Sequence, residues 1–315
     1  MEPTVTLDAA PSQLDPANLG PVALPPESEM GWRETYDWSK VILLLGTPIL
    51  TAVLLVVHLR LEGWHPELWV IAIGLHFLGQ LSISAGYHRL YAHRSYKAHP
   101  AVQACFLFFA ASAMQNSALK WCNDHRRHHV HTDEKEDPHP VTRGFFYVHM
   151  GWVMMVEKKR YRSNLVKDLM QNPLIQWQNR NYKKLFYFQV LVLPAAIGWL
   201  CGAPIGGVAV VGLLKTLAVL HSTFSVNSVA HMFGARPYAA GISARDNPLV
   251  GFVSCGEGYH NFHHVFPNDY RAGNRRRNLD AAKWVIWTLS QLGLAWDLRR
   301  AREADVARAR ATAVR

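Results

Sequence analysis

Four long apolar stretches limit what this chain can fold into. A bilayer-spanning helix needs about 20 mostly apolar residues. Four segments approach or reach that length with few charges: residues 41–59, 68–86, 185–201 and 205–226. A short link containing Gly63 joins the first two, and a three-residue link ending at Pro204 joins the last two. Because helices satisfy their own backbone groups in lipid, the pattern predicts an all-α membrane protein with four transmembrane helices in two hairpins.

A fifth apolar stretch, residues 101–119, has two possible placements. By hydropathy alone it could cross the membrane. The histidines before it and those after it would then lie on opposite sides of the bilayer and could not form one site. We therefore expect an interfacial or re-entrant helix, a placement that also suits its polar residues Gln103, Gln115 and Asn116.

The charge distribution predicts which side the polar segments occupy. The chain has 315 residues, half of them hydrophobic, and a net charge of +10. No helix-turn-helix, zinc-finger or RNP-like pattern indicates nucleic-acid binding. With four spans, residues 87–184 and 227–315 share one side with the N-terminus, and they hold 29 of the 33 Lys and Arg residues. The positive-inside rule then predicts that this side, with both termini, is cytoplasmic.

The chain should divide into three parts. Residues 1–36 are acidic and rich in Pro and Ala, which is typical of a disordered tail. Residues 37–298 contain the spans and the polar segments between them. Residues 299–315 are basic and rich in Ala, which predicts a helical C-terminal tail.

Nine of the 17 histidines fall into spaced groups within the polar segments. The groups are His88 with His93; His125, His128 and His129; His260, His263 and His264; and His231, which follows Asn227 at i+4. Spacing of i, i+3, i+4 places three imidazoles on one helix face. A five-residue spacing turns two rings about 140° apart on an ideal helix. The first pair should therefore straddle a helix end or point towards two metals.

This donor set predicts two metal ions. Nine histidines and one asparagine overfill one site and fit two metals with four or five ligands each, and neutral imidazole suits Fe, Zn, Cu or Ni. Structural zinc usually has four ligands, often with sulfur. The four cysteines are single, which also argues against an iron–sulfur cluster. The other eight histidines lack such spacing, and we expect them to serve packing or the surface.

The spaced histidines lie in motifs that resemble those of a known family. H-R-L-Y-A-H, D-H-R-R-H-H and G-E-G-Y-H-N-F-H-H-V-F-P-N-D-Y resemble the three histidine boxes of membrane fatty acid desaturases, most closely the delta-9 acyl-CoA (stearoyl-CoA) desaturases. N-S-V-A-H-M-F-G-A-R-P-Y resembles their further metal-ligand segment, and the similarity runs from residue 75 to 298. The resemblance implies two iron ions held by all nine spaced histidines, with Asn227 beside a metal-bound water.

The resemblance also implies a bent tunnel for an acyl chain. The residues matching its lining are Gln115, Asn116, Trp121 and Thr223, with Phe224 where the animal enzymes carry Trp. His76 and Gln80, in the second span, match positions near the closed end, where side-chain bulk limits chain length. At the positions that hold the CoA phosphates in animal enzymes, this chain has Val156 and Glu157, followed by Lys158–Arg160. Acyl-CoA, acyl carrier protein and membrane lipid therefore stay open as carriers.

The expected reaction is an O2-dependent oxidation. Unactivated methylenes offer no acidic proton and no leaving group, so the metal must carry the chemistry and no catalytic residue beyond its ligands is expected. We expect two electrons and O2 to introduce a cis double bond, at the delta-9 position by resemblance, into a saturated acyl chain. The alternatives are a related di-iron fatty-acid or alkane hydroxylase and, more remotely, a histidine-rich membrane metal-binding or transport protein.

Two further sets of contacts are expected around such a centre. A separate electron donor of the ferredoxin or cytochrome b5 type, with its reductase, should dock on the basic cytoplasmic surface. Ligating imidazoles also need acceptors that fix each ring. The candidate acceptors, which lie within or beside the histidine motifs, are Asp124, Asp137, Glu257 and Asp269.

Overall fold

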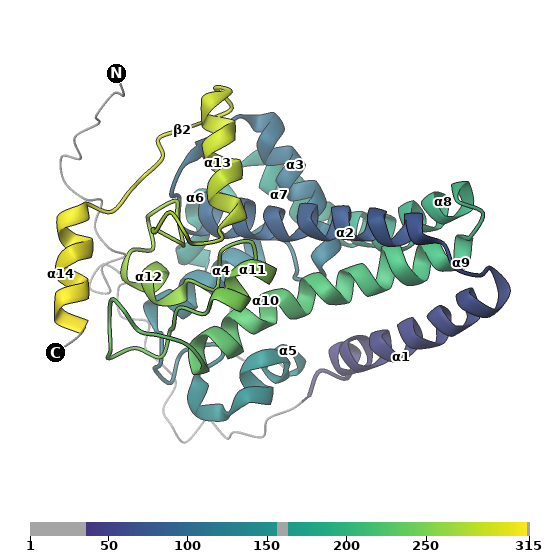
Figure 1. Cartoon of the computed structure of the whole chain (residues 1–315), viewed down its shortest axis with the longest axis horizontal. Coiled ribbons are helices and arrows are strands. Elements are labelled where there is room, and N and C mark those ends of the chain that lie inside the picture. The colour runs from purple at the N-terminus through teal and green to yellow at the C-terminus, as the bar shows by residue number, and fades with distance from the viewer. Residues whose placement is uncertain (1–35, 156–162, 314–315) are drawn as a thin grey trace. The chain divides into compact units, whose positions relative to one another are not determined.

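The computed structural model describes residues 36–155 and 163–313 (Figure 1). Almost all of the regular structure in these residues is helical, apart from one short antiparallel pair of strands. The predicted N-terminal tail, except for Tyr36, and residues 156–162 lie outside the described residues. Tyr36 forms an isolated antiparallel bridge with Met155, so the described part begins with a residue that is tied to the fold.

Four helices are long and apolar enough to cross a membrane, as predicted, by length and composition. They are Trp38–Leu61, Pro66–Ala92, Pro173–Leu200 and Pro204–Met232. Each is longer than the apolar stretch that predicted it, because the helix continues into polar sequence. The second and fourth helices therefore carry histidine motifs on their own ends, and the third begins at Pro173 instead of residue 185.

Three of these long helices combine α-helical and π-helical segments. The exception is the first long helix, which consists of α1 (Trp38–Leu61) alone. The second joins α2 (Pro66–Leu81) to the π-helix η3 (Ser82–Ala92). The third joins α7 (Pro173–Tyr187), η8 (Phe188–Val192) and α8 (Leu193–Leu200). The fourth joins α9 (Pro204–Gly206), η9 (Gly207–Leu214) and α10 (Lys215–Met232).

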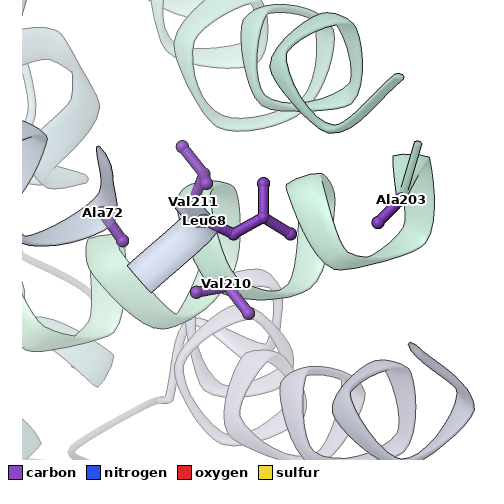
Figure 2. Packing of buried hydrophobic residues seen from close by; sticks show 5 residues of the cluster. All are labelled: Leu68, Ala72, Ala203, Val210 and Val211. Atoms are coloured by element: carbon purple, nitrogen blue, oxygen red, sulfur yellow. The ribbon is translucent and has the colours of Figure 1, made fainter. Parts of the chain in front are cut away.

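The two hairpins pack against each other through small and branched residues. Leu68 and Ala72 of α2 meet Ala203, Val210 and Val211 at the start of the fourth helix (Figure 2). All five side chains are buried. Because the hydrophobic effect does not drive helices together in lipid, close packing of this kind is what holds membrane helices against each other.

The turn after α1 also caps the fourth helix. The Glu62 carboxylate accepts hydrogen bonds from the backbone N–H groups of Ile205 (2.9 Å) and Gly206 (2.8 Å) and lies 2.8 Å from Nδ1 of His58. A Cβ at Gly206 would collide with the His58 ring. The carboxylate of the first hairpin thus caps the fourth helix by accepting from backbone N–H groups that have no partner within the helix.

The ambiguous apolar stretch forms a short helix, α3 (Pro100–Ala110), followed by a 3-10 turn, η4 (Ala111–Ala113). Its 14 residues would extend only about 21 Å at 1.5 Å per residue, which is too short for a bilayer core of about 30 Å. It ends earlier than predicted because Met114 and Asn116 have positive φ angles of 59° and 70°. Gln115 and Asn116 therefore lie in a turn and not in the helix.

The remaining elements are short and are gathered near one end of α2 and α10 (Figure 1). They are β1 (Lys97–Ala98), α4 (Ala118–Val130), η5 (Val141–Arg143), η6 (Tyr147–Gly151), α5 (Trp152–Met154), η7 (Ser163–Val166), α6 (Lys167–Met170), α11 (Pro248–Val253), α12 (His260–Val265), α13 (Ala281–Gln291), β2 (Ala295–Trp296) and α14 (Glu303–Ala313). We call these elements the cap. In the sheet, Lys97 pairs with Trp296 and Ala98 with Ala295.

The C-terminal segment is a docked helix. Val306 of α14 is buried in a cluster with Tyr238 and Phe262, next to the third histidine group. Arg310 donates a hydrogen bond to the Tyr238 hydroxyl at 2.8 Å. The described part of the expected tail, residues 299–313, thus contributes to the cap.

Candidate metal centre

The nine spaced histidines converge into two adjacent clusters. His88, His93, His125, His129 and His263 form the first, which we call the five-histidine cluster. His128, His231, His260 and His264 form the second, the four-histidine cluster. Within each cluster the candidate ligand nitrogens all lie within 4.8 Å of one another. The structure therefore groups the nine histidines as five and four, and the number of bound metal ions stays a prediction.

The π-helical end of the second long helix explains the five-residue spacing of the first pair. In a π-helix the hydrogen bond runs from i to i+5, so residues five apart are stacked along the axis. The His93 N–H donates to the His88 carbonyl at 3.0 Å, and the two rings lie 4.7 Å apart. The pair straddles a helix end, as one expectation had it. The other expectation, that the two rings serve two metals, is wrong, because both belong to the five-histidine cluster.

The second and third groups each supply both clusters. On α4, His125 and His129 face the five-histidine cluster, and His128 faces the other. On α12 the division is reversed: His260 and His264 belong to the four-histidine cluster and His263 to the five-histidine cluster. The i, i+4 pair of each helix therefore belongs to one cluster, while the i+3 residue belongs to the other.

The buried ring nitrogens are arranged as metal ligands. Nε2 of His263 lies 3.0 Å from Nε2 of His88 and 3.0 Å from Nε2 of His129, and Nε2 of His93 lies 2.8 Å from that of His125. In the four-histidine cluster, the buried Nε2 atoms of His128 and His231 have no hydrogen-bond partner among the described residues. Unpaired buried polar atoms are costly. A metal ion bound between the rings would satisfy them, so these residues fit two histidine-bound ions.

Burial favours the neutral, metal-binding form of six of the cluster rings. Removal from solvent lowers the pKa of His93, His125 and His129 well below the usual range, and neighbouring histidines lower it further. The same causes lower the pKa of His260, His263 and His264. Neutral imidazole is the species that binds metal.

Polar side chains orient three of the rings by contacting their Nδ1 atoms. Nδ1 of His88 lies 2.7 Å from Glu257, Nδ1 of His128 lies 2.9 Å from Asp137, and Nδ1 of His231 lies 2.6 Å from the Ser243 hydroxyl. Two of the four predicted acceptors therefore contact a ligand. Asp269 instead binds the Arg271 guanidinium, with contacts of 3.0 and 2.8 Å, and Asp124 accepts from Asn123 and lines the cavity described below.

A buried arginine holds Glu257 in its ionised form. Burial alone raises the pKa of Glu257, but the Arg89 guanidinium and His88 outweigh it and hold the pKa far below its usual value. Arg89 lies 2.9 Å from both Glu257 and Asp280, and it also donates to the Tyr270 carbonyl. Asp280 in turn accepts from the Lys283 N–H at the start of α13. These contacts connect the first histidine group to α13.

The helix that carries the third histidine group is capped from a distant part of the chain. Oδ1 of Asp246 accepts hydrogen bonds from the backbone N–H groups of Asn261 (2.9 Å) and Phe262 (3.2 Å). The residue at its own N-cap position, Tyr259, makes no side-chain cap bond. Asp246 therefore fixes the start of α12, where His260 begins the ligand run.

A cavity of about 230 Å³ reaches the five-histidine cluster. The Trp121 ring stacks on the His125 ring with their centroids 4.8 Å apart. Nε1 of Trp121 donates to the Gln115 side chain, which donates to the Thr223 hydroxyl. All five residues expected along the tunnel line this cavity: Gln115, Asn116, Trp121, Thr223 and Phe224. Asn227 lines it too, together with His125. His76 and Gln80 are not among the lining residues; Gln80 is 1% exposed and donates to the Ser254 carbonyl.

Comparison with known proteins agrees with this geometry. The family model for fatty acid desaturases matches residues 62–297. The chain belongs to the fatty acid desaturase family. It is 35% identical over 279 residues to human stearoyl-CoA desaturase, covering 86% of this chain and 76% of that protein. It is 33% identical over 298 residues to mouse stearoyl-CoA desaturase 4, covering 93% and 82%.

A fungal relative is longer than this desaturase-family chain. The acyl-CoA desaturase 1 of Saccharomyces cerevisiae is 33% identical over 274 residues, which cover 85% of this chain and 53% of the yeast protein. The chain thus spans about half the length of that relative.

One residue of this fatty acid desaturase site was not predicted. His139 was expected to serve packing or the surface, but its ring lies 4.3 Å from ligand His128 and also lines the cavity. Its Nδ1 lies 3.8 Å from Asp137, and burial with the neighbouring His128 lowers the pKa of His139 to about 3. The available signal was its position two residues after Asp137, within the D-P-H-P segment.

Proposed function

We propose that this protein is a membrane di-iron fatty-acyl desaturase that forms a cis double bond at the delta-9 position. The reaction removes two hydrogens from adjacent methylenes. With O2, two electrons and two protons it yields one alkene and two water molecules. The observation that supports it best is the cavity, whose lining combines apolar side chains with His125 of the five-histidine cluster. An acyl chain in it would pass next to the metal ligands.

The nine histidines would hold two iron ions, five rings on one side and four on the other. When bound, the irons would supply the oxidising power that unactivated methylenes require. Asn227 precedes His231 by one turn of α10 and lines the cavity, so its amide can hold a water beside the four-histidine cluster. The ring partners Glu257, Asp137 and Ser243 keep the imidazoles oriented.

The cavity residues would bind and bend the acyl chain. Gln115, Thr223 and Trp121 form a hydrogen-bonded group in the cavity lining. Leu44, Leu220 and Phe224 belong to a buried apolar cluster and also line the cavity. A polar group beside an apolar wall fixes where the chain turns, and close packing around methylenes keeps water from the oxidant.

The proposal also covers the acyl carrier and the electron donor. The fungal and animal relatives carry acyl-CoA or stearoyl-CoA in their names, so acyl-CoA is the first carrier to test, with acyl carrier protein and membrane lipid as comparisons. Residues 156–160, where the phosphate contacts would be, lie outside the described residues. The basic segments predict a cytoplasmic site that accepts electrons from a separate ferredoxin or cytochrome b5 type donor.

Lipid profiling tests the function directly. The full chain would be expressed in a host that lacks unsaturated fatty acids, and its total fatty acids would be analysed for double-bond position. We expect delta-9 cis alkenes, and none from a His263→Ala variant that reaches the membrane equally well. Mid-chain alcohols instead of alkenes would make the protein a hydroxylase, and wild-type product from His263→Ala would contradict the metal assignment.

A further inference from the structure

Helix α13 exposes an aromatic face that nothing in the described residues covers. Trp284 is 48% exposed and Trp287 is 50% exposed, and their i, i+3 spacing places them on one side of the helix. Leu292, just past the helix end, is 67% exposed. The opposite side is anchored, because Ala282 and Ile286 are fully buried. Removing apolar surface from water is favourable by roughly 25 cal/mol for each Å². An exposed face of this kind is therefore expected to be covered by an apolar environment.

The direction of α13 differs from that of the long helices. In Figure 1 it runs across the direction of α2 and α10. A helix that crosses the spans at a steep angle lies close to the plane of the membrane. Its start is fixed to the second long helix, since Asp280 binds both the Lys283 N–H and the Arg89 guanidinium of η3. Its end leads into β2, whose partner strand β1 directly precedes the apolar helix α3.

Cationic side chains lie in the segment that leads into this helix. Arg275, Arg276 and Arg277 precede α13 and are exposed. Tryptophan is the residue enriched where membrane meets water, and adjacent arginines attract anionic headgroups. A helix with aromatic residues on one side and basic residues at its edge is the pattern of an interfacial anchor.

We propose that the exposed face of α13 lies in the membrane–water interface, with Trp284 and Trp287 in the headgroup region and Arg275–Arg277 against anionic lipid. The helix is thus an in-plane anchor that holds the cap against the bilayer beside the four candidate spans. There are two alternatives to the membrane. If a water-soluble protein binds this face, the face lies outside the lipid. If a second copy of the chain binds it, two α13 faces lie against each other. The proposal does not depend on the reaction catalysed.

The depth of a single spin label tests this placement. Cys105 and Cys201 are the cysteines that are not buried, and both would be replaced by Ser. A nitroxide would then be attached at Thr288→Cys, an exposed position between the tryptophans and Leu292, so that both rings stay in place. The control label, Ala307→Cys, lies at an exposed position of α14. The full chain would be placed in phosphatidylcholine nanodiscs with and without phosphatidylglycerol.

Collision with oxygen, which concentrates in lipid, would be compared with collision with a water-soluble nickel complex. We expect the label at 288 to favour oxygen and the label at 307 to favour nickel. Phosphatidylglycerol should increase the depth at 288, and an Arg275→Glu, Arg276→Glu, Arg277→Glu variant should lose that increase. A Trp284→Ser, Trp287→Ser variant should shift the reading towards that of residue 307, whereas Trp284→Phe, Trp287→Phe should keep it.

Two results would overturn the proposal. One is a label at 288 as open to nickel as the label at 307 in both lipids, which would mean an aqueous face. The other is dipolar broadening between labels at 288 that disappears on dilution with unlabelled protein, which would mean contact between two copies. Both readings come from magnetic resonance alone, so neither requires a metal-loaded or active enzyme.

Discussion

The Glu257 carboxylate lies 2.7 Å from Nδ1 of His88, and Arg89 holds it from the other side at 2.9 Å. This contact fixes which nitrogen of His88 faces the cluster. Glu257→Gln should therefore lower metal affinity by about 10–100-fold, the range for loss of a ring-orienting partner. Iron content after dialysis against a graded chelator series would measure it. Asp269→Asn is the matched control, because Asp269 binds Arg271, and equal iron loss from both variants would contradict the role of Glu257.

The ligand assignment predicts a sharp split between histidines. His128→Ala, His231→Ala and His263→Ala should each abolish product and lower the iron content of purified protein, while the protein still reaches the membrane. His131→Ala should retain both, since His131 pairs with Glu134 at 3.1 Å outside the two clusters. Near-normal product from any of the first three variants would refute the assignment.

Gln80 provides a test of chain-length control. Its side chain is buried in the second long helix, at a position that resembles the closed end of the family's tunnel. If the resemblance holds at this position, Gln80→Ala should shift the preferred substrate towards longer chains without loss of iron, because a smaller side chain would lengthen the tunnel. Leu78→Ala, on an exposed position of the same helix, is the control. An unchanged chain-length profile would make Gln80 structural and place the tunnel end elsewhere.

Electron delivery should depend on ionic strength. If an acidic donor docks on the basic cap, turnover should fall steeply past a few tens of millimolar salt, because the screening length shrinks to about 10 Å at 0.1 M. The measurement is the initial rate across a salt series with donor reduction kept limiting. Turnover that is flat with salt under these conditions would argue against electrostatic docking.

The remote cap of α12 should contribute to stability. Asp246→Ala removes the acceptor for the Asn261 and Phe262 N–H groups and should destabilise the protein by about 1 kcal/mol, as for other lost N-caps. Asp246→Asn keeps an oxygen acceptor and should retain most of the stability. Thermal unfolding of the detergent-solubilised protein would compare them, and equal midpoints for Ala and wild type would exclude the cap.

Sequence reasoning found the parts of this fold that depend on local pattern. Hydropathy predicted four spans, and histidine spacing indicated the nine cluster members. It could not find the cap that Asp246 provides for α12, because that contact joins distant parts of the chain. It named Glu257 as a candidate acceptor but could not tell which ring it contacts. The π-helical hydrogen bond from His93 to His88 could not be predicted either. The directions of the rings were predicted from the α-helical period, which a π-helix does not follow. His139 was missed because a single histidine carries no spacing signal.

The ligand set has a consequence for how the protein is made. His88 and His263 lie 3.0 Å apart in space but 175 residues apart in the chain. During synthesis the third histidine group emerges only after the last long helix, so neither cluster can be completed on a nascent chain that stops there. Long-range closure of this kind is slow, and bound metal adds its binding free energy to the folded state. Iron supply would thus act as a checkpoint on maturation, with starved cells accumulating chains whose hairpins have formed but whose cap stays open to proteases.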